Sequence, residues 1–283
     1  MDQIAVIGGG TMGAGIAEVC ARAGSSVVVI EADHDGVARC RARIDASLQR
    51  AVRADRLTPA DAESALARID VATELAAAAP ADLVIEAVPE VESLKLDLFR
   101  QVDAILGPEA ILASNTSSIP LVKMASVTSR PERVVGVHFF NPAPVLPLVE
   151  IVASLLTSEE TMQTVTDFAE KRLGKTTIRS QDRAGFIVNA LLIPYLLSAI
   201  RMLESGFASA ADIDAGMVQG CAHPQGPLAL TDLIGLDTTA AVAQSMYEEF
   251  KEPLYAPPPL LLRMVDAGLL GRKTGRGFFP YVH

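Results

Sequence analysis

The chain has 283 residues and a net charge of −10; half of its residues are hydrophobic and a fifth are charged. This composition is that of an ordinary globular protein, and the length is sufficient for two domains. The acidic balance excludes a general attraction to nucleic acid or to an anionic membrane surface, so an anionic ligand requires a local basic patch.

The first elements form a βαβ unit. Residues 3–7 (QIAVI) predict a short buried strand, which a glycine turn and a helix of small residues (TMGAGIAEVCARAG) follow. Residues 26–31 (SVVVIE) then predict a second strand. A strand, a helix and a strand within about thirty residues imply a parallel sheet.

A helical pair follows before the sheet resumes. The pattern is helical from residue 36 to about 68, and Thr58-Pro59 marks the start of its second helix. Buried strands are then predicted at 82–86, 110–114, 134–138, 148–152 and 176–178, with helices at 92–105 and 158–173.

The remainder of the chain is predicted to be helical. Helices are expected at 184–205, 209–219, 226–250 and 257–268, and residues 174–183 (GKTTIRSQDR) are expected to connect the two domains. We therefore predict an α/β fold: a Rossmann-type doubly wound sheet with a helical-pair insertion over 1–182, followed by an all-α domain over 183–283.

The sequence favours a cytoplasmic protein without membrane spans or metal sites. The apolar stretch 184–200 is shorter than the ~20 residues of a spanning helix and contains Asn189, so it is predicted to be a buried helix. A strand that begins at Gln3 leaves no room for a signal peptide. The three cysteines and four histidines are scattered, without disulfide or zinc spacing.

Three glycines follow the first predicted strand as G-x-G-x-x-G: Gly8, Gly10 and Gly13. Glycines there permit a tight turn, a close approach to a diphosphate and close helix packing. The N–H groups at the start of the helix, at Thr11 and Met12, are then available to the diphosphate. Because the motif alone is weak, a glycine turn without a ligand is the alternative.

Glu31 supports the interpretation of the glycine motif as a dinucleotide site. It ends the second predicted strand about twenty residues after the motif. A carboxylate at that place accepts hydrogen bonds from both ribose hydroxyls of NAD and repels the additional phosphate of NADP. The alternative is a surface charge at a strand end, but the combination predicts NAD as the cofactor.

His138 is the candidate catalytic base. Hydride transfer from an alcohol to nicotinamide also requires loss of the hydroxyl proton, to a base or a metal site. His34 follows a strand on a loop, His223 lies in an expected turn (HPQGP), and His283 is terminal. His138 instead ends an apolar run (VVGVHFFNP) at the carboxyl end of a strand, where ligands bind in open α/β sheets.

Glu150 is the expected partner of His138. It lies in LPLVEIV, an otherwise apolar strand, and a buried carboxylate is costly without a partner. A pair with His138 satisfies the carboxylate and fixes the tautomer of the imidazole. The alternative for a histidine on an apolar strand is a core residue whose hydrogen bonds are satisfied.

These residues belong to a longer series of matches. GGGTMGAGIAEV, ASNTSSIP, HFFNPAPVLPLVEIV, DRAGFIVNALLIPYLL, ASAADIDAGMVQGCAHPQGPLALTDLIGLDT and GRKTGRGFF run in order across the chain. In these stretches the chain resembles the 3-hydroxyacyl-CoA dehydrogenases, most closely their short bacterial 3-hydroxybutyryl-CoA members. The resemblance implies an oxidoreductase of fatty acid metabolism that oxidises a (3S)-3-hydroxyacyl-CoA, with NAD, to the 3-oxoacyl form.

The resemblance also implies the roles of several residues. His138 is the general base and Glu150 stabilises its imidazolium, while Ser117 and Asn189 hold the substrate oxygens. Glu90, Lys95, Ser117, Asn141 and Lys273 are placed around NAD. Without the resemblance, the residues alone favour a solvated pair at a helix start for Glu90 and Lys95, a turn residue for Asn141 and a loop charge for Lys273. Family members are commonly dimers through the second domain, so a homodimer is expected.

One departure leaves the carrier of the acyl group open. The family has a serine and, seven residues later, a lysine that contact CoA; Ser47 matches, but Ala54 replaces the lysine. Arg53 and Arg56 flank Ala54, within a segment (39–56) of six arginines and two aspartates. These arginines are candidates for the CoA phosphates. The alternatives are a solvated face, or a docking surface for an acidic acyl carrier protein in a related biosynthetic dehydrogenase.

Overall fold

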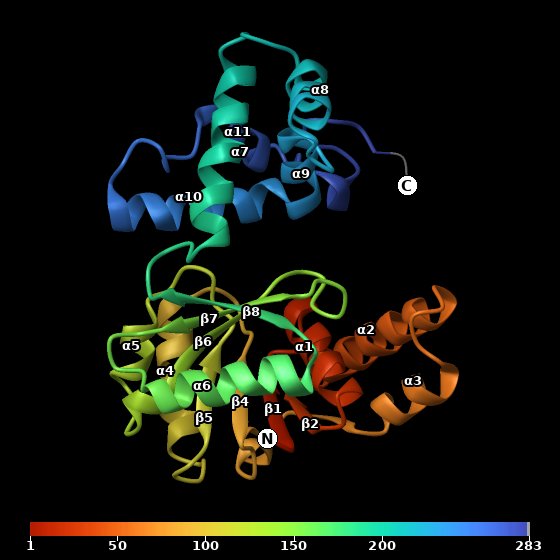
Figure 1. The fold of residues 1–283 in the computed structure, drawn as a ribbon, viewed down its shortest axis with the longest axis vertical. Coiled ribbons are helices and arrows are strands. Elements are labelled where there is room, and N and C mark those ends of the chain that lie inside the picture. The colour runs from red at the N-terminus through yellow and green to blue at the C-terminus, as the bar shows by residue number, and fades with distance from the viewer. Residues whose placement is uncertain (282–283) are drawn as a thin grey trace. The chain divides into compact units, whose positions relative to one another are not determined.

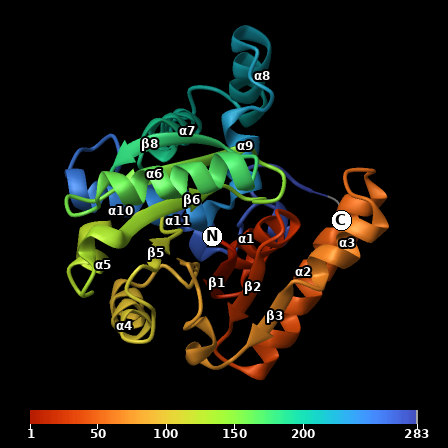
Figure 2. The same cartoon turned by 60° about the horizontal axis from the view of Figure 1, so that its bottom comes forward.

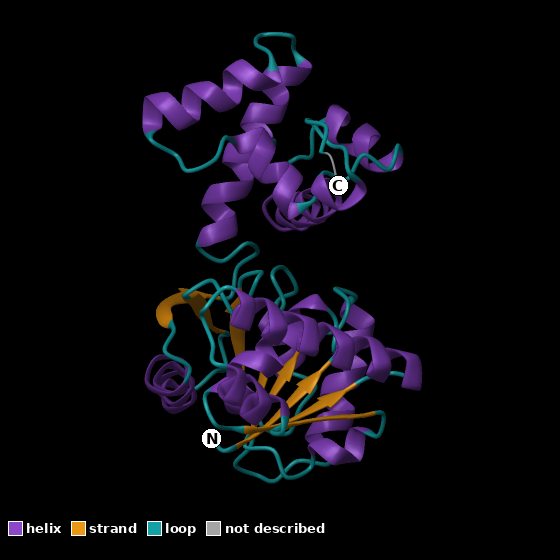
Figure 3. Cartoon of the chain, turned by 90° about the vertical axis from the view of Figure 1, so that its right-hand side faces the viewer, coloured by secondary structure: helices purple, strands orange, loops and turns teal. Residues whose placement is uncertain are grey.

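The computed structural model describes residues 1–281, so His283 lies outside the described residues. The chain divides into two compact units, Met1–Arg183 and Ala184–His283. The division follows Arg183, whereas the sequence placed it after Asp182. Figures 1 and 3 show strands and helices in the first unit and helices in the second.

The first unit contains an eight-stranded sheet in the order β3-β2-β1-β4-β5-β6-β7-β8. The strands are β1 (Gln3–Ile7), β2 (Ser26–Ile30), β3 (Ile69–Ala72), β4 (Leu83–Glu86), β5 (Ile111–Ser114), β6 (Val134–Phe139), β7 (Leu148–Ala153) and β8 (Thr176–Gln181). All neighbours pair in parallel except β6 and β7. The order reverses at β1 and β4, and ligands of such sheets bind at the reversal.

Helices cover both faces of this sheet. They are α1 (Thr11–Arg22), α2 (His34–Arg53), α3 (Pro59–Leu66), α4 (Glu92–Asp103), α5 (Leu121–Ala125) and α6 (Glu159–Asp167), which a π-helical turn over Phe168–Arg172 extends. The predicted pair α2 and α3 packs on α1, as Figure 2 shows. The side chains of Asp33 and Thr58 cap α2 and α3 by accepting bonds from the N–H groups of Gly36 and Asp61.

The core of the first unit is built from apolar residues of the central strands. All residues of β4 and β5 are buried, and so are the last four residues of β1. Continuous burial is typical of parallel strands that have helices on both faces. Polar groups therefore emerge at the ends of these strands, where the candidate site residues lie.

The second unit consists of helices. They are α7 (Val188–Glu204), α8 (Ala210–Cys221), α9 (Pro227–Ile234), α10 (Leu236–Phe250) and α11 (Pro259–Asp266), with a 3₁₀ turn over Arg272–Thr274. Their apolar faces enclose a separate core that includes Leu197, Leu228 and Met246. None of the helices within residues 1–281 is long and apolar enough to cross a membrane.

The predicted fold class is confirmed, but two details of the prediction were wrong. The single helix expected over 226–250 is two helices, because Gly235 adopts a φ of +104° and ends α9. The strand predicted at 176–178 is present as β8, but it is longer than predicted: it continues to Gln181 as an edge strand whose polar residues are largely exposed. The sequence analysis also missed β3 and α5, which have only four and five residues.

Candidate active site

Polar residues gather at the carboxyl ends of the parallel strands in the first unit. Gly8 follows β1, Glu31 follows β2, and Glu86 and Ser114 are the last residues of β4 and β5. His138 is the penultimate residue of β6. Because these strands are neighbours in the sheet, residues from five separate segments reach one edge.

The glycine loop has the geometry of a diphosphate site. Gly8 has a φ of +94°, and a side chain at Gly13 would collide with the carbonyl oxygen of Gly8 at 1.7 Å. A Cβ at Gly10 would meet nothing within 4 Å, so this face of the loop is open. Gly10 provides no side-chain cap for α1, which begins at Thr11 and continues through Met12. The helix N-terminus therefore keeps the backbone donors that an anion requires.

Glu31 is fixed against this loop. Its Oε1 accepts a hydrogen bond from the N–H of Gly9 at 2.9 Å. Among residues 1–281, no hydrogen bond to its Oε2 is found. One carboxylate oxygen thus orients the side chain, and the other is available for ribose hydroxyls.

His138 and Glu150 form a buried pair. They lie directly opposite each other on the antiparallel strands β6 and β7, so their side chains share one face of the sheet. Nδ1 of His138 is 2.7 Å from Oε2 of Glu150, and the Glu150 side chain has no exposed area. Because an ionised carboxylate only accepts, the neutral ring carries its proton on Nδ1, and Nε2 is the ring nitrogen that can accept a proton.

Ser117 lies in a loop that Glu90 organises. Oε1 of Glu90 accepts hydrogen bonds from the N–H groups of Ser117 (3.1 Å) and Ser118 (3.2 Å) and from the hydroxyls of Thr116 and Ser118. Ser117 is half-buried, and Glu90 is 37% exposed. A single carboxylate oxygen thus fixes the backbone on both sides of the serine.

Lys95 lies beneath Glu90, where it joins two carboxylates. Its Nζ is 2.8 Å from Oε2 of Glu90 and 2.9 Å from Oε1 of Glu86, and the side chains of Lys95 and Glu86 are each 1% exposed. The hydroxyl of Ser114 donates to Glu86 at 2.6 Å. The solvated pair considered for Glu90 and Lys95 is therefore wrong for Lys95.

The pKa values of the two carboxyls move in opposite directions. Burial raises the pKa of Glu86 even though Lys95 and the hydroxyl of Ser114 oppose the change. Burial also acts to raise the pKa of Glu90, but Lys95 and the hydroxyls of Thr116 and Ser118 outweigh it, so the pKa of Glu90 is lowered. Sequence reasoning missed Glu86, although an acidic residue at the end of the apolar run DLVIE was a visible signal.

Asn115, which the sequence analysis did not single out, connects the ends of two neighbouring strands. Oδ1 of Asn115 accepts from the N–H of Phe139 at 2.9 Å, which joins the end of β5 to the end of β6. Asn141 follows two residues later and is exposed, joined to Pro142 by a cis peptide bond. Asn141 therefore stays accessible to a ligand at the same sheet edge.

The basic segment of α2 is partly engaged with the protein itself. Arg41 and Arg43 donate to the carbonyl oxygens of Val71 and Gly9. Arg53 and Arg56 are exposed, and neither forms an ion pair with any residue in 1–281. Ser47 is half-buried on the same helix. Among the three residues predicted to contact CoA, Arg53 and Arg56 are thus exposed and available to a ligand.

Asn189 and Lys273 belong to the second unit. Asn189 is the second residue of α7 and is half-buried. Nζ of Lys273 lies 2.6 Å from both carboxylate oxygens of Asp237, near the start of α10. The positive charge of Lys273 is thus shared with an acid that the sequence analysis did not single out.

Comparisons with known proteins agree with this geometry. Residues 3–183 match the sequence profile of the 3-hydroxyacyl-CoA dehydrogenase NAD-binding domain, and residues 185–281 match that of the C-terminal domain. The chain belongs to the 3-hydroxyacyl-CoA dehydrogenase family. It is 52% identical over 282 residues to a 3-hydroxybutyryl-CoA dehydrogenase of Mycobacterium tuberculosis, with 99% of both chains covered.

Solved structures of the family have the same fold. The crystal structure of M. tuberculosis FadB2 superposes with a TM-score of 0.98 at 52% identity, covering 100% of this chain and 99% of that one. That of the (S)-3-hydroxybutyryl-CoA dehydrogenase PaaH1 from Ralstonia eutropha gives 0.94 at 46% identity and covers 100% of both chains. The predicted family is therefore confirmed.

The cofactor of the family fits the first unit. The matched domain is the family's NAD-binding domain, so NAD is the cofactor. The open face at Gly10, the uncapped start of α1 and the oriented carboxylate of Glu31 suit its diphosphate and ribose. The chain is accordingly an oxidoreductase of the 3-hydroxyacyl-CoA dehydrogenase family.

Proposed function

We propose that the chain catalyses the reversible oxidation of a short-chain (3S)-3-hydroxyacyl-CoA, such as 3-hydroxybutyryl-CoA, to the 3-oxoacyl-CoA. The observation that carries the proposal is the buried His138–Glu150 pair at the ligand-binding edge of an NAD-binding sheet. The names of the relatives support the substrate, since two of those compared act on 3-hydroxybutyryl-CoA.

In the proposed mechanism, Nε2 of His138 takes the proton of the 3-hydroxyl group. NAD⁺ supplies the acceptor for the hydride that leaves C3. Glu150, held 2.7 Å from Nδ1, stabilises the imidazolium that forms and keeps the ring in one tautomer. The reaction then yields the ketone with a protonated His138, and in the reverse direction His138 returns the proton.

Ser117 and Asn189 are proposed to hold the substrate oxygens. The hydrogen bonds that the N–H groups of Ser117 and Ser118 donate to Glu90 fix Ser117 before the substrate arrives. A donor already in place costs no reorganisation in the transition state. Glu90, Lys95, Asn141 and Lys273 are proposed to serve NAD, Lys95 by positioning Glu90 because it is itself buried.

The assay of choice is reduction of acetoacetyl-CoA with NADH, followed through the loss of NADH absorbance. Turnover with acetoacetyl-CoA, declining along a series of longer 3-oxoacyl-CoA substrates, is expected. A carrier-protein thioester run in parallel tests the other carrier. No turnover with any CoA thioester, but turnover with the carrier-protein thioester, would overturn the proposed substrate.

The CoA nucleotide is proposed to contact Ser47, Arg53 and Arg56 of α2. The two arginines are exposed and lack partners among residues 1–281, so their charges are available to phosphates. Replacing both by glutamine is expected to raise the KM for acetoacetyl-CoA with little change in kcat. An unchanged KM would remove α2 from the substrate site.

A homodimer through the second unit is also proposed. Leu191 on α7 is 74% exposed and Phe207 is 78% exposed, and exposed apolar side chains of this size favour association. Sedimentation should give twice the mass of the chain, whereas a monomer at all concentrations would contradict the proposal. We propose a cytoplasmic location because Cys20, Cys40 and Cys221 are all free thiols.

A further inference from the structure

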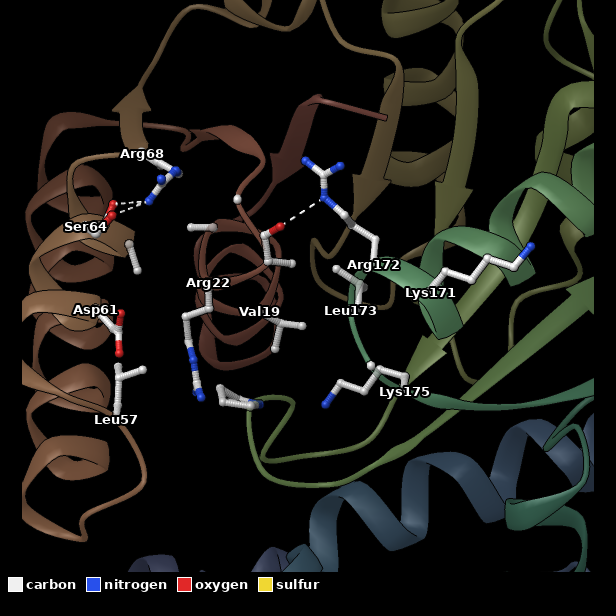
Figure 4. A pocket seen from close by; sticks show the side chains of 16 residues that line it. Val19, Arg22, Leu57, Asp61, Ser64, Arg68, Lys171, Arg172, Leu173 and Lys175 are labelled. Atoms are coloured by element: carbon white, nitrogen blue, oxygen red, sulfur yellow. Dashed lines mark hydrogen bonds between the residues drawn. The ribbon is translucent and has the colours of Figure 1, made fainter.

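The first unit contains a cavity whose lining includes none of the residues placed in the proposed reaction. Its volume is about 660 Å³, and it lies between the end of α1, the start of α3 and residues 171–175. Figure 4 shows Leu57, Asp61 and Ser64 on one wall, Lys171 to Lys175 on the other, and Arg22 between them. The described lining includes neither the His138–Glu150 pair nor the glycine loop.

The charge of the cavity is mostly positive. Five basic residues line it, against the one carboxylate of Asp61: Arg22, Arg68, Lys171, Arg172 and Lys175. Three of these cations are engaged by other side chains, since Arg172 binds Asp2, Lys171 binds Asp167 and Arg68 binds Ser64. Arg22 and Lys175 are the two cations left to bind a ligand. They come from segments more than a hundred residues apart, and they lie together although the chain as a whole has a net charge of −10.

Two hydrogen bonds hold the ammonium group of Lys175 in place and leave its third N–H available. Its Nζ donates to the carbonyl oxygens of Ala143 and Leu146, both at 2.7 Å, and no acceptor for its third N–H is found within residues 1–281. Burial lowers the pKa of Lys175, and the nearby charge of Arg22 lowers it further. Two like charges thus face the same end of the cavity.

Arg22 is only partly satisfied. One of its terminal nitrogens donates to Glu18 at 3.2 Å, and its side chain is 28% exposed. A guanidinium has five N–H donors, so most of them remain for a ligand. A doubly charged anion between Arg22 and Lys175 would accept hydrogen bonds from both and would remove their mutual repulsion.

We propose that this cavity binds an organic phosphate ester of nucleotide size, with its phosphate between Arg22 and Lys175. The walls offer apolar surface for the organic part at Val19, Leu57 and Pro144. The volume falls within the ~300–1,000 Å³ of small-molecule sites. The site goes beyond the proposed function because neither proton transfer nor hydride transfer needs it.

The test is calorimetric titration of the full chain with adenosine 3′,5′-bisphosphate and, separately, with inorganic phosphate. Saturation with NADH beforehand keeps both ligands out of the cofactor site. The bisphosphate should bind more tightly than inorganic phosphate, and Arg22→Gln and Lys175→Gln should each weaken it by about tenfold or more. Lys123→Gln removes the same charge from a surface pair with Glu92 and should change nothing.

Two results would overturn the site: no binding of the bisphosphate by the NADH-saturated protein, or equal affinities in Arg22→Gln and Lys123→Gln. Because Lys175 also supports a loop, Arg22→Gln is the decisive variant if Lys175→Gln does not fold. Reduction of acetoacetyl-CoA by the same wild-type preparation is measured separately. Failure of the site therefore cannot be confused with failure of the proposed function.

KM values of Arg22→Gln show whether the bound phosphate belongs to CoA or to a separate ligand. A higher KM for acetoacetyl-CoA, with an unchanged KM for the N-acetylcysteamine thioester that lacks phosphates, supports the site and assigns the phosphate to CoA. Unchanged KM values for both, together with weakened bisphosphate binding, support the site and assign it to a separate nucleotide-like ligand.

Discussion

Two buried groups of charges lie at the same sheet edge of the first unit and serve different purposes. His138 and Glu150 are one base and one acid, joined by one contact of 2.7 Å. Glu86, Lys95 and Glu90 are two acids around one ammonium, and the two carboxylates also accept hydrogen bonds from three hydroxyls and three backbone N–H groups. In the proposed reaction His138 gains and loses a proton, whereas in the cluster Lys95 holds the two carboxylates in place.

This difference separates activity from stability. Replacing His138 should stop proton transfer, and its effect on the fold is limited to the one buried carboxylate, Glu150, that it leaves without its partner. Removing the ammonium of the cluster should destabilise the fold, because the carboxylate of Glu86 would then lie buried without a counter-charge. The following variants test that contrast.

The largest effect is expected from His138→Ala. Loss of the general base should lower kcat with acetoacetyl-CoA by about 10²–10⁴-fold. The Kd for NADH should change little, since the glycine loop and Glu31 are untouched, whereas the melting temperature should fall because the buried Glu150 loses its partner. Steady-state kinetics and a thermal melt measure both quantities. Wild-type turnover in this variant would exclude His138 from the reaction.

Lys95→Met should have the next largest effect, on the fold. The side chain is 1% exposed and joins Glu86 to Glu90, so its loss should cost about 3–5 kcal/mol of unfolding free energy. Denaturant titration measures the change, and Lys123→Met on the surface is the matched control. Adding Glu86→Gln should recover part of the loss. A melt equal to that of the control would show that the cluster does not stabilise the fold.

Glu31→Ala should have a smaller effect, confined to cofactor choice. The oriented carboxylate is expected to favour NAD over NADP, so its removal should lower kcat/KM for NAD by about tenfold and reduce the preference over NADP. Kinetics with both cofactors measure the ratio. If the ratio of kcat/KM for NAD to that for NADP stays the same, Glu31 does not bind the ribose of the cofactor.

The smallest effect is a dependence of stability on pH that comes from Glu90. Because the pKa of Glu90 is lowered below its ordinary value of 4.5, ionised Glu90 stabilises the folded state at neutral pH. That contribution is lost as the pH falls below 4.5 and through the lowered value. Wild type should therefore exceed Glu90→Gln in stability near pH 7 and converge with it in acid, in urea titrations across pH. A constant difference would contradict this account, and Glu63→Gln is the surface control.

The sequence was enough to predict the elements that carry a strong pattern. The βαβ unit, the glycine loop and the long helix α7 follow from hydrophobic periodicity and glycine spacing. The His138–Glu150 pair was predictable because each residue interrupts an apolar run, and the structure places the two directly opposite. To predict that the second unit is helical, it was enough that no strand pattern occurs after Asp182.

Features that depend on tertiary contacts were not predictable in the same way. Lys95 has the sequence neighbourhood of a surface residue, and only the approach of Glu86 from β4 makes its burial favourable. The cavity between Arg22 and Lys175 joins segments about 150 residues apart, so no local pattern indicates it. Gly235 was visible, but a glycine within an apolar helical pattern does not by itself show a positive φ.

The central claim is that Glu150 acts on the reaction through His138, and a double-mutant cycle tests it most directly. The kcat for acetoacetyl-CoA reduction is compared among wild type, His138→Ala, Glu150→Gln and the double variant. Glu150→Gln alone should slow turnover by roughly 10²-fold, since the imidazolium loses its carboxylate. The double variant should be no slower than His138→Ala. If the two effects instead multiply, Glu150 acts independently of His138 and its proposed role in stabilising the imidazolium is wrong.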